Sequence, residues 1–460
     1  MLKKSSRAFI IALLITVFTF AALWFAIRVG SSKKETNVTS AHTVSNQTEQ
    51  IIVALARRGE PDFSGMGRKT DSYIELTGYK PDGSDKDRGK PYLSIPFDYI
   101  KMDQQYLDSQ VRHLIEGYQP ESWFFYDRIK VGEKWYFFSI NYDREKDSFV
   151  VGDRLMPEYT SSQEGYFPDY DEKQDLMLSS CGQYRKINKS VSGLIWDLLP
   201  NVWSDPFADI SELPLSARPE KSKKKDEKPQ PVFISGARML KDGTMVLQLI
   251  EGVENGYERS ALLYKTASNP DKNYYVPVGF HLWYPLFSIP KIYSPIETSP
   301  DGKIFWLWTV LPDDSKKNQY GIWLIQYSTV SKKLERLIKL SEGKDEDDVV
   351  SKSRMMSIGF NFIRCNPSDP KILAVTSYDG ILLIDTVAKK VLKTISKEKK
   401  ADQYSQRIFN LKWSPQGDKI AYLLNDGSIS VYDLRTDKTD LAAKDKSIFD
   451  FIWITKKYKN

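Results

Sequence analysis

The stretch RIFNLKWSPQGDKIAYLLNDGSISVYDLRT, residues 407–436, decides the fold of this chain. It contains three short runs of branched and aromatic residues, separated by the turn sequences Ser-Pro-Gln-Gly and Asn-Asp-Gly. Such runs predict β-strands, and Asp-Gly favours a tight hairpin because glycine tolerates a positive φ. We expect Asp433, at the end of the third run, to accept backbone N–H bonds in the following turn.

The same pattern precedes this stretch at residues 366–395. Pro367 and Pro415 lie 48 residues apart, as do Asp385 and Asp433. Looser copies begin near residues 297 and 237, and a fifth, weaker copy ends at residues 192–200. Units of 40–50 residues with several strands each are typical of a β-propeller. The prediction is therefore an all-β propeller of about six to eight blades, with seven favoured, preceded by one transmembrane helix and one or two short helices.

Three features of the repeat resemble the blades of WD40 and TolB-type propellers. They are the Ser-Pro-x-Gly turn, the Asp-Gly hairpin and the Tyr-Asp pair at Tyr432–Asp433. The sequence LIWDL at residues 194–198 contains the Trp-Asp pair of WD40 repeats itself, whereas their Gly-His pair is absent. The resemblance covers roughly residues 233–455, and it implies rigid, loop-lined faces of the kind that many propellers use for assembly.

The chain ends on an incomplete repeat. The sequence IFDFIWI at residues 448–454 matches IFNLKWS at residues 408–414, but no further strands follow it. An innermost strand left without partners would expose an open edge. We expect strands from the N-terminal part to complete this last blade and close a ring, and the hairpin-like residues 134–155 are our candidates.

The N-terminus carries the clearest local signal. Residues 8–27 are uncharged and apolar, and twenty such residues in a helix span about 30 Å, the thickness of a bilayer core. Lys3, Lys4 and Arg7 precede this segment, so the basic bias favours a cytoplasmic N-terminus. The predicted protein is a single-pass membrane protein with a periplasmic or extracellular propeller. Cleavage at the small-x-small site Gly30-Ser31-Ser32 and a reversed topology remain open alternatives.

Three regions follow from this reading. Residues 1–30 form a cytoplasmic tip and membrane anchor, residues 31–70 a tether with a short helix, and residues 71–460 the propeller, with a charged insertion at 217–231. Asn46 and Glu49 match a capping box, which predicts the short helix at residues 47–58. Apolar residues at helical spacing predict a second helix between Asp103 and Gly117.

The sequence contains little that points to chemistry. Its 66 basic and 60 acidic residues are interspersed, so no nucleic-acid partner is expected. The spacing of the three histidines, His42, His113 and His281, does not match a metal site. The two cysteines, Cys181 and Cys365, are interpreted as isolated thiols or as a disulfide pair in an oxidising compartment. No G-x-S-x-G elbow, P-loop or G-x-G-x-x-G occurs. We therefore predict no catalytic, cofactor-binding or metal-binding residue and no cofactor.

Two functions are compatible with this reading. The first is a non-catalytic, membrane-tethered propeller that presents its faces to a protein or peptide outside the cytoplasm. The alternative is an extracytoplasmic enzyme or carbohydrate-binding propeller that uses the central channel. Enzyme activity stays uncertain, and the sequence favours its absence. Trp306 and Trp308 bear on the choice, because a channel-facing indole can stack on a sugar, although packing between blades is the favoured role for both.

Overall fold

The computed structural model describes most of the chain beyond residue 47. The described residues are 48–58, 73–96, 114–116, 121–131, 134–152, 169–178, 183–186, 191–198, 233–239, 243–254, 257–266, 269–282, 296–312, 320–328, 330–331, 333–342, 362–377, 380–396 and 408–457. The predicted membrane segment 8–27, the insertion 217–231, His42, His113 and Cys181 lie outside these residues. Within them, no helix combines the length and the apolar character needed to cross a bilayer.

The described chain is almost entirely β-structure, with 28 strands in six sheets. The sheet that contains both ends of the described chain, here called the closing sheet, consists of β28 (Ile448–Lys457), β1 (Thr48–Arg58), β2 (Tyr73–Tyr79) and β3 (Lys90–Pro96). The next two sheets are β4 (Leu114–Glu116), β5 (Ser122–Val131), β6 (Lys134–Asp143) and β7 (Ser148–Val151), then β8 (Asp169–Asp171), β9 (Leu176–Leu178), β10 (Gln183–Lys186) and β11 (Val191–Leu194).

The remaining strands continue the same succession along the chain. One eight-stranded sheet contains β12 (Phe233–Met239), β13 (Met245–Glu254), β14 (Tyr257–Thr266), β15 (Asn269–Leu282), β16 (Glu297–Thr298), β17 (Ile304–Pro312), β18 (Tyr320–Ser328) and β19 (Lys333–Glu342). Two four-stranded sheets follow: β20 (Ile363–Cys365), β21 (Ile372–Ser377), β22 (Gly380–Asp385) and β23 (Lys390–Ser396), then β24 (Ile408–Trp413), β25 (Lys419–Leu424), β26 (Ser428–Asp433) and β27 (Lys438–Lys444).

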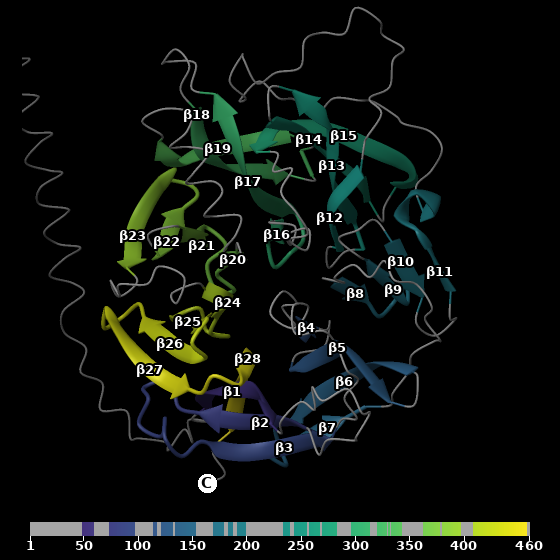
Figure 1. Cartoon of the computed structure of the whole chain (residues 1–460). Helices are drawn as coiled ribbons and strands as arrows, with labels where there is room; N and C mark the ends of the chain where they lie inside the picture. The colour runs from purple at the N-terminus through teal and green to yellow at the C-terminus, as the bar shows by residue number, and fades with distance from the viewer. Residues whose placement is uncertain are drawn as a thin grey trace, which may run out of the picture. The chain divides into compact units, whose positions relative to one another are not determined.

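These sheets follow one another around a common centre, as in a β-propeller (Figure 1). Neighbouring sheets meet through their first strands: β16 contacts β20, β20 contacts β24, and β24 contacts β28. On the other side, β4 contacts β8, and β8 contacts β12. The all-β propeller predicted from the repeat is therefore confirmed, and the described residues form six sheets.

The favoured number of seven blades differs from these six sheets for a structural reason. The meanders β12–β15 and β16–β19 each pair in chain order, as separate blades do. They are joined by one antiparallel residue pair between β15 and β17, Phe280 with Val310. Two repeats in the sequence therefore become one continuous sheet.

The turn that follows the third strand of a blade forms as the sequence predicts. Asp433 accepts the backbone N–H groups of Arg435 and Thr436 at 2.8 and 3.1 Å. Asp385 accepts those of Val387 and Ala388, both at 2.8 Å. By contrast, the Trp-Asp pair of LIWDL does not end a strand, because residues 195–198 form a single 3₁₀ turn after β11.

The incomplete C-terminal repeat is the innermost strand of the closing sheet, as predicted. β28 pairs antiparallel with β1 from Thr48 opposite Lys457 to Ala56 opposite Ile448. The strands that complete the blade are β1, β2 and β3 rather than the candidate residues 134–155, which form β6 and β7 of the next sheet. That candidate was wrong because both segments have hairpin patterns, and local sequence does not specify which distant strand a hairpin joins.

Both predicted helices are contradicted where the structure describes them. Residues 48–58, predicted as part of a helix, form the strand β1, and residues 114–116 at the end of the second predicted helix form β4. The run from Ile51 to Ala56 is buried on both faces of its sheet, so it lacks the alternation of a half-exposed strand. Residues 101–113 lie outside the described part.

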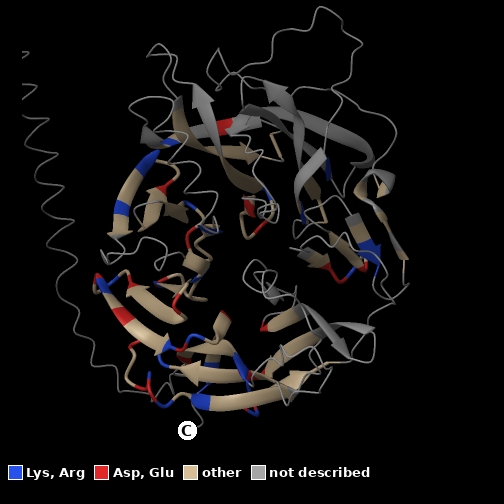
Figure 2. Ribbon diagram, in the orientation of Figure 1, with Lys and Arg blue, Asp and Glu red and all other residues tan. Residues whose placement is uncertain are grey.

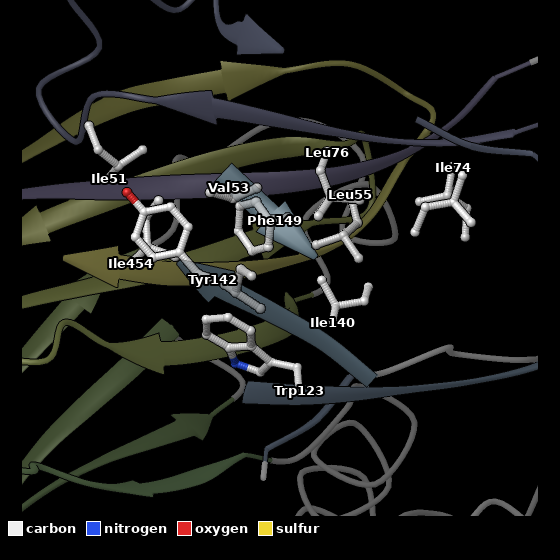
Figure 3. Packing of buried hydrophobic residues seen from close by; sticks show 12 residues of the cluster. Ile51, Val53, Leu55, Ile74, Leu76, Trp123, Ile140, Tyr142, Phe149 and Ile454 are labelled. Atoms are coloured by element: carbon white, nitrogen blue, oxygen red, sulfur yellow. The ribbon is translucent and has the colours of Figure 1, made fainter. Parts of the chain in front are cut away.

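Alternate side chains of β1 join the closing sheet to its two neighbours. Ile51, Val53 and Leu55 pack with Trp123, Ile140 and Phe149 of the β4–β7 sheet (Figure 3). The other face, with Ile52, Ala54 and Ala56, packs against the β24–β27 sheet through Ala421, Leu423, Ile429 and Val431. Each fully buried large aliphatic side chain contributes about 1.5–3 kcal/mol. Apolar contacts on both of its faces thus stabilise the closing sheet.

Ionic contacts around Asp147 also join the closing sheet to the β4–β7 sheet. Asp147, in the β6–β7 turn, accepts hydrogen bonds from Tyr142 and Tyr92 at 2.8 and 3.1 Å. Lys90 of β3 and Lys456 of β28 both lie 2.7 Å from its other carboxylate oxygen. Burial alone would raise the pKa of Asp147, but the contacts with Lys456, Lys90 and Tyr142 outweigh burial and hold the pKa well below its usual value.

This depressed pKa predicts that Asp147 stabilises the fold fully above about pH 4 and progressively less as the pH falls below that value. A group whose pKa is lower in the folded state contributes stability above its unfolded value of about 3.9, and that contribution declines as the pH falls further. We expect Asp147→Asn (D147N) to lower the free energy of unfolding at pH 6 and to have a smaller effect at pH 3, measured by urea unfolding. The control is Asp440→Asn at an exposed position of β27. An equal loss at both pH values would contradict the prediction.

Candidate functional site

A polar cleft of about 370 Å³ opens between the closing sheet and the β24–β27 sheet. We call it the seam cleft. Four chain segments form it: the start of β1, the β2–β3 turn, the turn after β24 and the turn after β26. Its lining residues are Thr48, Glu49, Gln50, Lys80, Pro81, Asp82, Gln416, Asp418, Lys419 and Arg435.

Two glycines set the positions of the cleft walls. Gly83 has a φ of +70°, and a Cβ there would meet the carbonyl oxygen of Leu441 at 2.2 Å, so the β2–β3 turn lies directly against β27. Gly417 also has a φ of +70°, and its carbonyl accepts a hydrogen bond of 2.8 Å from the amide of Asn366. The positive φ favours glycine at both positions, and the neighbouring atoms leave no room for a Cβ. The first turn is therefore held against the backbone of β27, and the second against the side chain of Asn366.

Asp418 is the centre of a hydrogen-bonded network on one wall. The Ser414 hydroxyl donates to its carboxylate at 2.8 Å, and the Arg435 guanidinium lies at 2.9 Å. The side-chain amide of Gln50, in the closing sheet, donates to the Asp418 carboxylate at 3.4 Å. Burial raises the pKa of Asp418, but the Ser414 hydrogen bond and the charge of Lys419 outweigh this and lower it overall. Asp418 is therefore ionised at neutral pH.

The second wall is more exposed and has its own acid. Asp82 accepts the backbone N–H of Ser84 at 2.9 Å, and this bond lowers the pKa of the Asp82 carboxyl. Lys80 is exposed beside it. The cleft as a whole presents three basic and three acidic side chains, and both signs of charge occur on the turns around it (Figure 2).

The side chains that line the cleft restrict the classes of ligand that could bind there. Its described lining includes no aromatic side chain on which a sugar or base could stack, and Pro81 is the one apolar side chain in that lining. Its balanced charge does not match a polyanion, which requires an excess of lysine and arginine. Amides, carboxylates and cations in a cleft of this size suit a short polar peptide.

The centre of the ring was the other predicted location for a site. On the inner strands, Glu297 of β16 pairs with Arg364 of β20 at 3.0 Å. Asp450 of β28 is fully buried, accepts a 2.5 Å hydrogen bond from Asn410 and lies 3.6 Å from the Lys412 ammonium. These acids are therefore engaged in contacts between blades.

Four described tryptophans have structural roles rather than a role in stacking on a ligand. Trp306 and Trp308 are buried against the β20–β23 sheet, and the Trp306 indole donates to Gln326. The indoles of Trp413 and Trp453 donate to backbone carbonyls of the preceding blade, those of Arg364 at 2.9 Å and Lys412 at 3.4 Å. The preference for blade packing over a stacking site is confirmed for Trp306 and Trp308.

The sequence predicted no site residue, and it missed the seam cleft. Cys365 is a free thiol, and His281 lies in β15. Among the described residues, no group of three or more His, Cys, Asp or Glu side chains is arranged to hold a metal ion. The turn residues 414–419 were recognisable as a turn, but their contact with residues 48–50 and 80–82 depends on ring closure.

Comparison with known proteins identifies no family for this chain. No protein-family model and no curated protein sequence matches the chain. Among solved structures, a candidate 6-phosphogluconolactonase from Bacteroides uniformis has 12% identity and a TM-score of 0.39, covering 89% of this chain and 100% of its own. Apo AztD from Citrobacter koseri has 11% identity and a TM-score of 0.43, covering 89% and 99%.

A third solved structure, the Dos1 propeller, has 10% identity and a TM-score of 0.29, covering 82% of this chain and 67% of its own. Similarities this weak identify no family and carry no activity over to this chain. The propeller architecture described above follows from the strand order and the sheet pairing.

Proposed function

We propose that this protein is a non-catalytic β-propeller that binds a protein or peptide partner at the seam cleft, outside the cytoplasm and tethered to a membrane by residues 8–27. The observation that carries the proposal is the chemistry of the cleft. It joins polar side chains of both charges on turns that the β27 backbone and the Asn366 side chain hold in place. A rigid scaffold with a polar, peptide-sized cleft lowers the entropic cost of binding.

Two sequence features support the location. Residues 8–27 form an uncharged apolar segment long enough to cross a bilayer as a helix. The basic residues before this segment favour a cytoplasmic N-terminus. The propeller would then lie on the opposite side of the membrane, facing partners in the periplasm or outside the cell.

The contacts of the inner strands favour this role over catalysis or saccharide binding at the ring centre. That alternative calls for acids or indoles directed at a ligand. Glu297 and Asp450 instead pair with Arg364 and with Asn410 and Lys412, and the indoles of Trp413 and Trp453 bond to backbone carbonyls.

One labelling experiment tests both the location and the binding. In a Cys181→Ser background, Gln416→Cys (Q416C) is made in the full-length chain and treated in intact cells with a membrane-impermeant maleimide. Burial raises the pKa of the remaining thiol, Cys365, to about 12, so it stays protonated and reacts little. We expect rapid labelling at position 416. A bound peptide at ten times its Kd should slow labelling about tenfold, because about a tenth of the sites stay free.

The matched control is Val387→Cys (V387C), at an exposed position in the β22–β23 turn outside the cleft. It should label as fast and gain no protection from peptide. The probes are blocked octapeptides that alternate threonine with lysine or glutamate. Labelling of neither position in intact cells would refute the extracytoplasmic location. Labelling of both without protection by any probe would refute peptide binding at the cleft.

A further inference from the structure

The strand β1 extends beyond the strand that covers its outer edge. β1 pairs with β28 from Thr48 onward, whereas its pairing with β2 begins only at Ile52, opposite Tyr79. Among the described residues, 48–51 therefore pair with a strand on one side only. Their other edge lies along the seam cleft, which Thr48, Glu49 and Gln50 line. An edge of this kind offers unpaired backbone donors and acceptors.

The contacts of β28 show which backbone groups of β1 face the cleft. Thr455, the partner of Gln50, donates its backbone N–H to the Glu121 carboxylate at 2.9 Å, so this N–H points away from β1. In an antiparallel ladder, both members of such a pair direct their N–H and C=O away from each other. Gln50 therefore directs both groups away from β28, and by the two-residue period Thr48 does the same.

The β2–β3 turn does not satisfy these groups. After Tyr79 the chain turns away from β1 towards β27, where Gly83 meets Leu441. Pro81 has no N–H to donate. Among the hydrogen bonds of the described residues, none joins the backbone of Thr48 or Gln50 to residues 80–89. With respect to the described part of the chain, the edge is thus open over about four residues, the length of one short strand.

We propose that this edge takes an extended, mixed-charge peptide segment of a partner protein as an additional strand, paired with Thr48–Gln50 and continuing the line of β2. The inference rests on the proposed function and adds the mode of binding. The added strand would bond to the N–H and C=O groups of Thr48 and Gln50. Its side chains would lie among the charged groups of the cleft, with Asp418 and Arg435 on one turn and Lys80 and Asp82 on another, so a segment of mixed charge is the complementary occupant.

A pair of substitutions at one position separates backbone pairing from side-chain contact. Gln50→Ala (Q50A) and Gln50→Pro (Q50P) both remove the side-chain amide that reaches Asp418, but only Q50P removes the cleft-facing N–H. The proline removes no bond to β28, because that N–H points away from β28. We expect the octapeptide that best protects position 416 to bind the full-length Q50P about five- to tenfold more weakly than Q50A, by fluorescence anisotropy.

Two controls keep this comparison interpretable. Thermal unfolding should give Q50P and Q50A similar midpoints, whereas Glu49→Pro (E49P), which removes an N–H directed at β28, should lower the midpoint. Peptide in which alternate amides are N-methylated should bind wild-type protein no better than Q50P binds the unmodified peptide.

The outcomes distinguish this inference from the proposed function. Equal affinity of Q50P and Q50A for a peptide that still protects position 416 would overturn strand addition and leave binding at the cleft intact. Absence of binding by every octapeptide, together with no protection at position 416, would overturn both. Weaker binding by Q50P with an unchanged midpoint would support strand addition.

Discussion

Removal of residues 448–460 should abolish cooperative unfolding of this protein. The deletion removes β28, and with it the ladder to β1 and the buried side chains of Phe451, Ile452, Trp453 and Ile454. At about 1.5–3 kcal/mol each, these four side chains contribute about 6–12 kcal/mol. That is comparable with the whole free energy of unfolding of a typical domain, about 5–15 kcal/mol. Loss of the sigmoidal transition in urea, followed by far-UV circular dichroism and tryptophan fluorescence, is the expected result.

A shorter deletion provides the control. Removal of residues 458–460, which follow the last residue of β28, should leave the transition unchanged. A synthetic peptide of residues 447–457, added to the longer deletion during refolding, should restore the transition in part, because it supplies the missing strand. If the longer deletion unfolded with the wild-type midpoint, the closed ring would not be what stabilises this fold.

Asp450→Ala (D450A) should be the most destabilising single substitution of a charged residue on the inner strands. Asp450 is fully buried, and the Lys412 ammonium 3.6 Å away has almost no contact with solvent and, among the described residues, no hydrogen-bond partner. Removing the carboxylate leaves this positive charge buried without its counter-charge, and also leaves the Asn410 amide without its 2.5 Å acceptor. Breaking a buried pair from one side costs about 3–5 kcal/mol. The free energy of unfolding in urea measures the loss.

The double substitution Lys412→Met with Asp450→Asn (K412M/D450N) tests the cause. It removes both charges at similar volume, so it should be clearly more stable than D450A, although each charge removed alone is costly. A double-mutant cycle with K412M and D450N should give a coupling of more than about 1 kcal/mol. A loss below 1 kcal/mol for D450A, or additive effects in the cycle, would show that the pair is not coupled.

The sequence predicted the parts of this fold that depend on turns between residues close together in the chain. Pro367 and Pro415 open turns, and Asp385 and Asp433 bind the backbone N–H groups of the turns that follow their strands. These residues act over five positions or fewer, so a repeat of 48 residues makes them visible. The same repeat identified β28 as an innermost strand that needs partners from elsewhere.

The parts that the sequence did not predict depend on contacts across the whole chain. In β1, the apolar run of residues 51–56 is compatible with a buried strand or a short helix, and only its position between β28 and β2 selects the strand. Asn46 and Glu49 matched a helix cap, but Glu49 lies in a strand, opposite Lys456. Tertiary pairing therefore overrode a local helix signal.

The seam cleft was unpredictable for the same reason. Asp418 and Gln50 lie 368 residues apart in the chain, yet the Gln50 side chain reaches the Asp418 carboxylate. Nothing in either segment alone marks it as a binding residue, since polar turns are common on any propeller. The six-sheet count, in turn, depends on a single residue pair, Phe280 with Val310, that no repeat pattern reveals.

The pairing of β1 with β28 has a consequence for how the protein is made. Thr48 and Lys457 are opposite each other although 409 positions separate them in the chain (457 − 48 = 409). During synthesis at about 5–20 residues per second, β1 emerges early and must wait tens of seconds for its partner. Bringing the two together then costs about 5 kcal/mol of loop entropy. A polypeptide that terminates prematurely would keep a bare strand edge, so completeness of translation and foldability are coupled in this molecule.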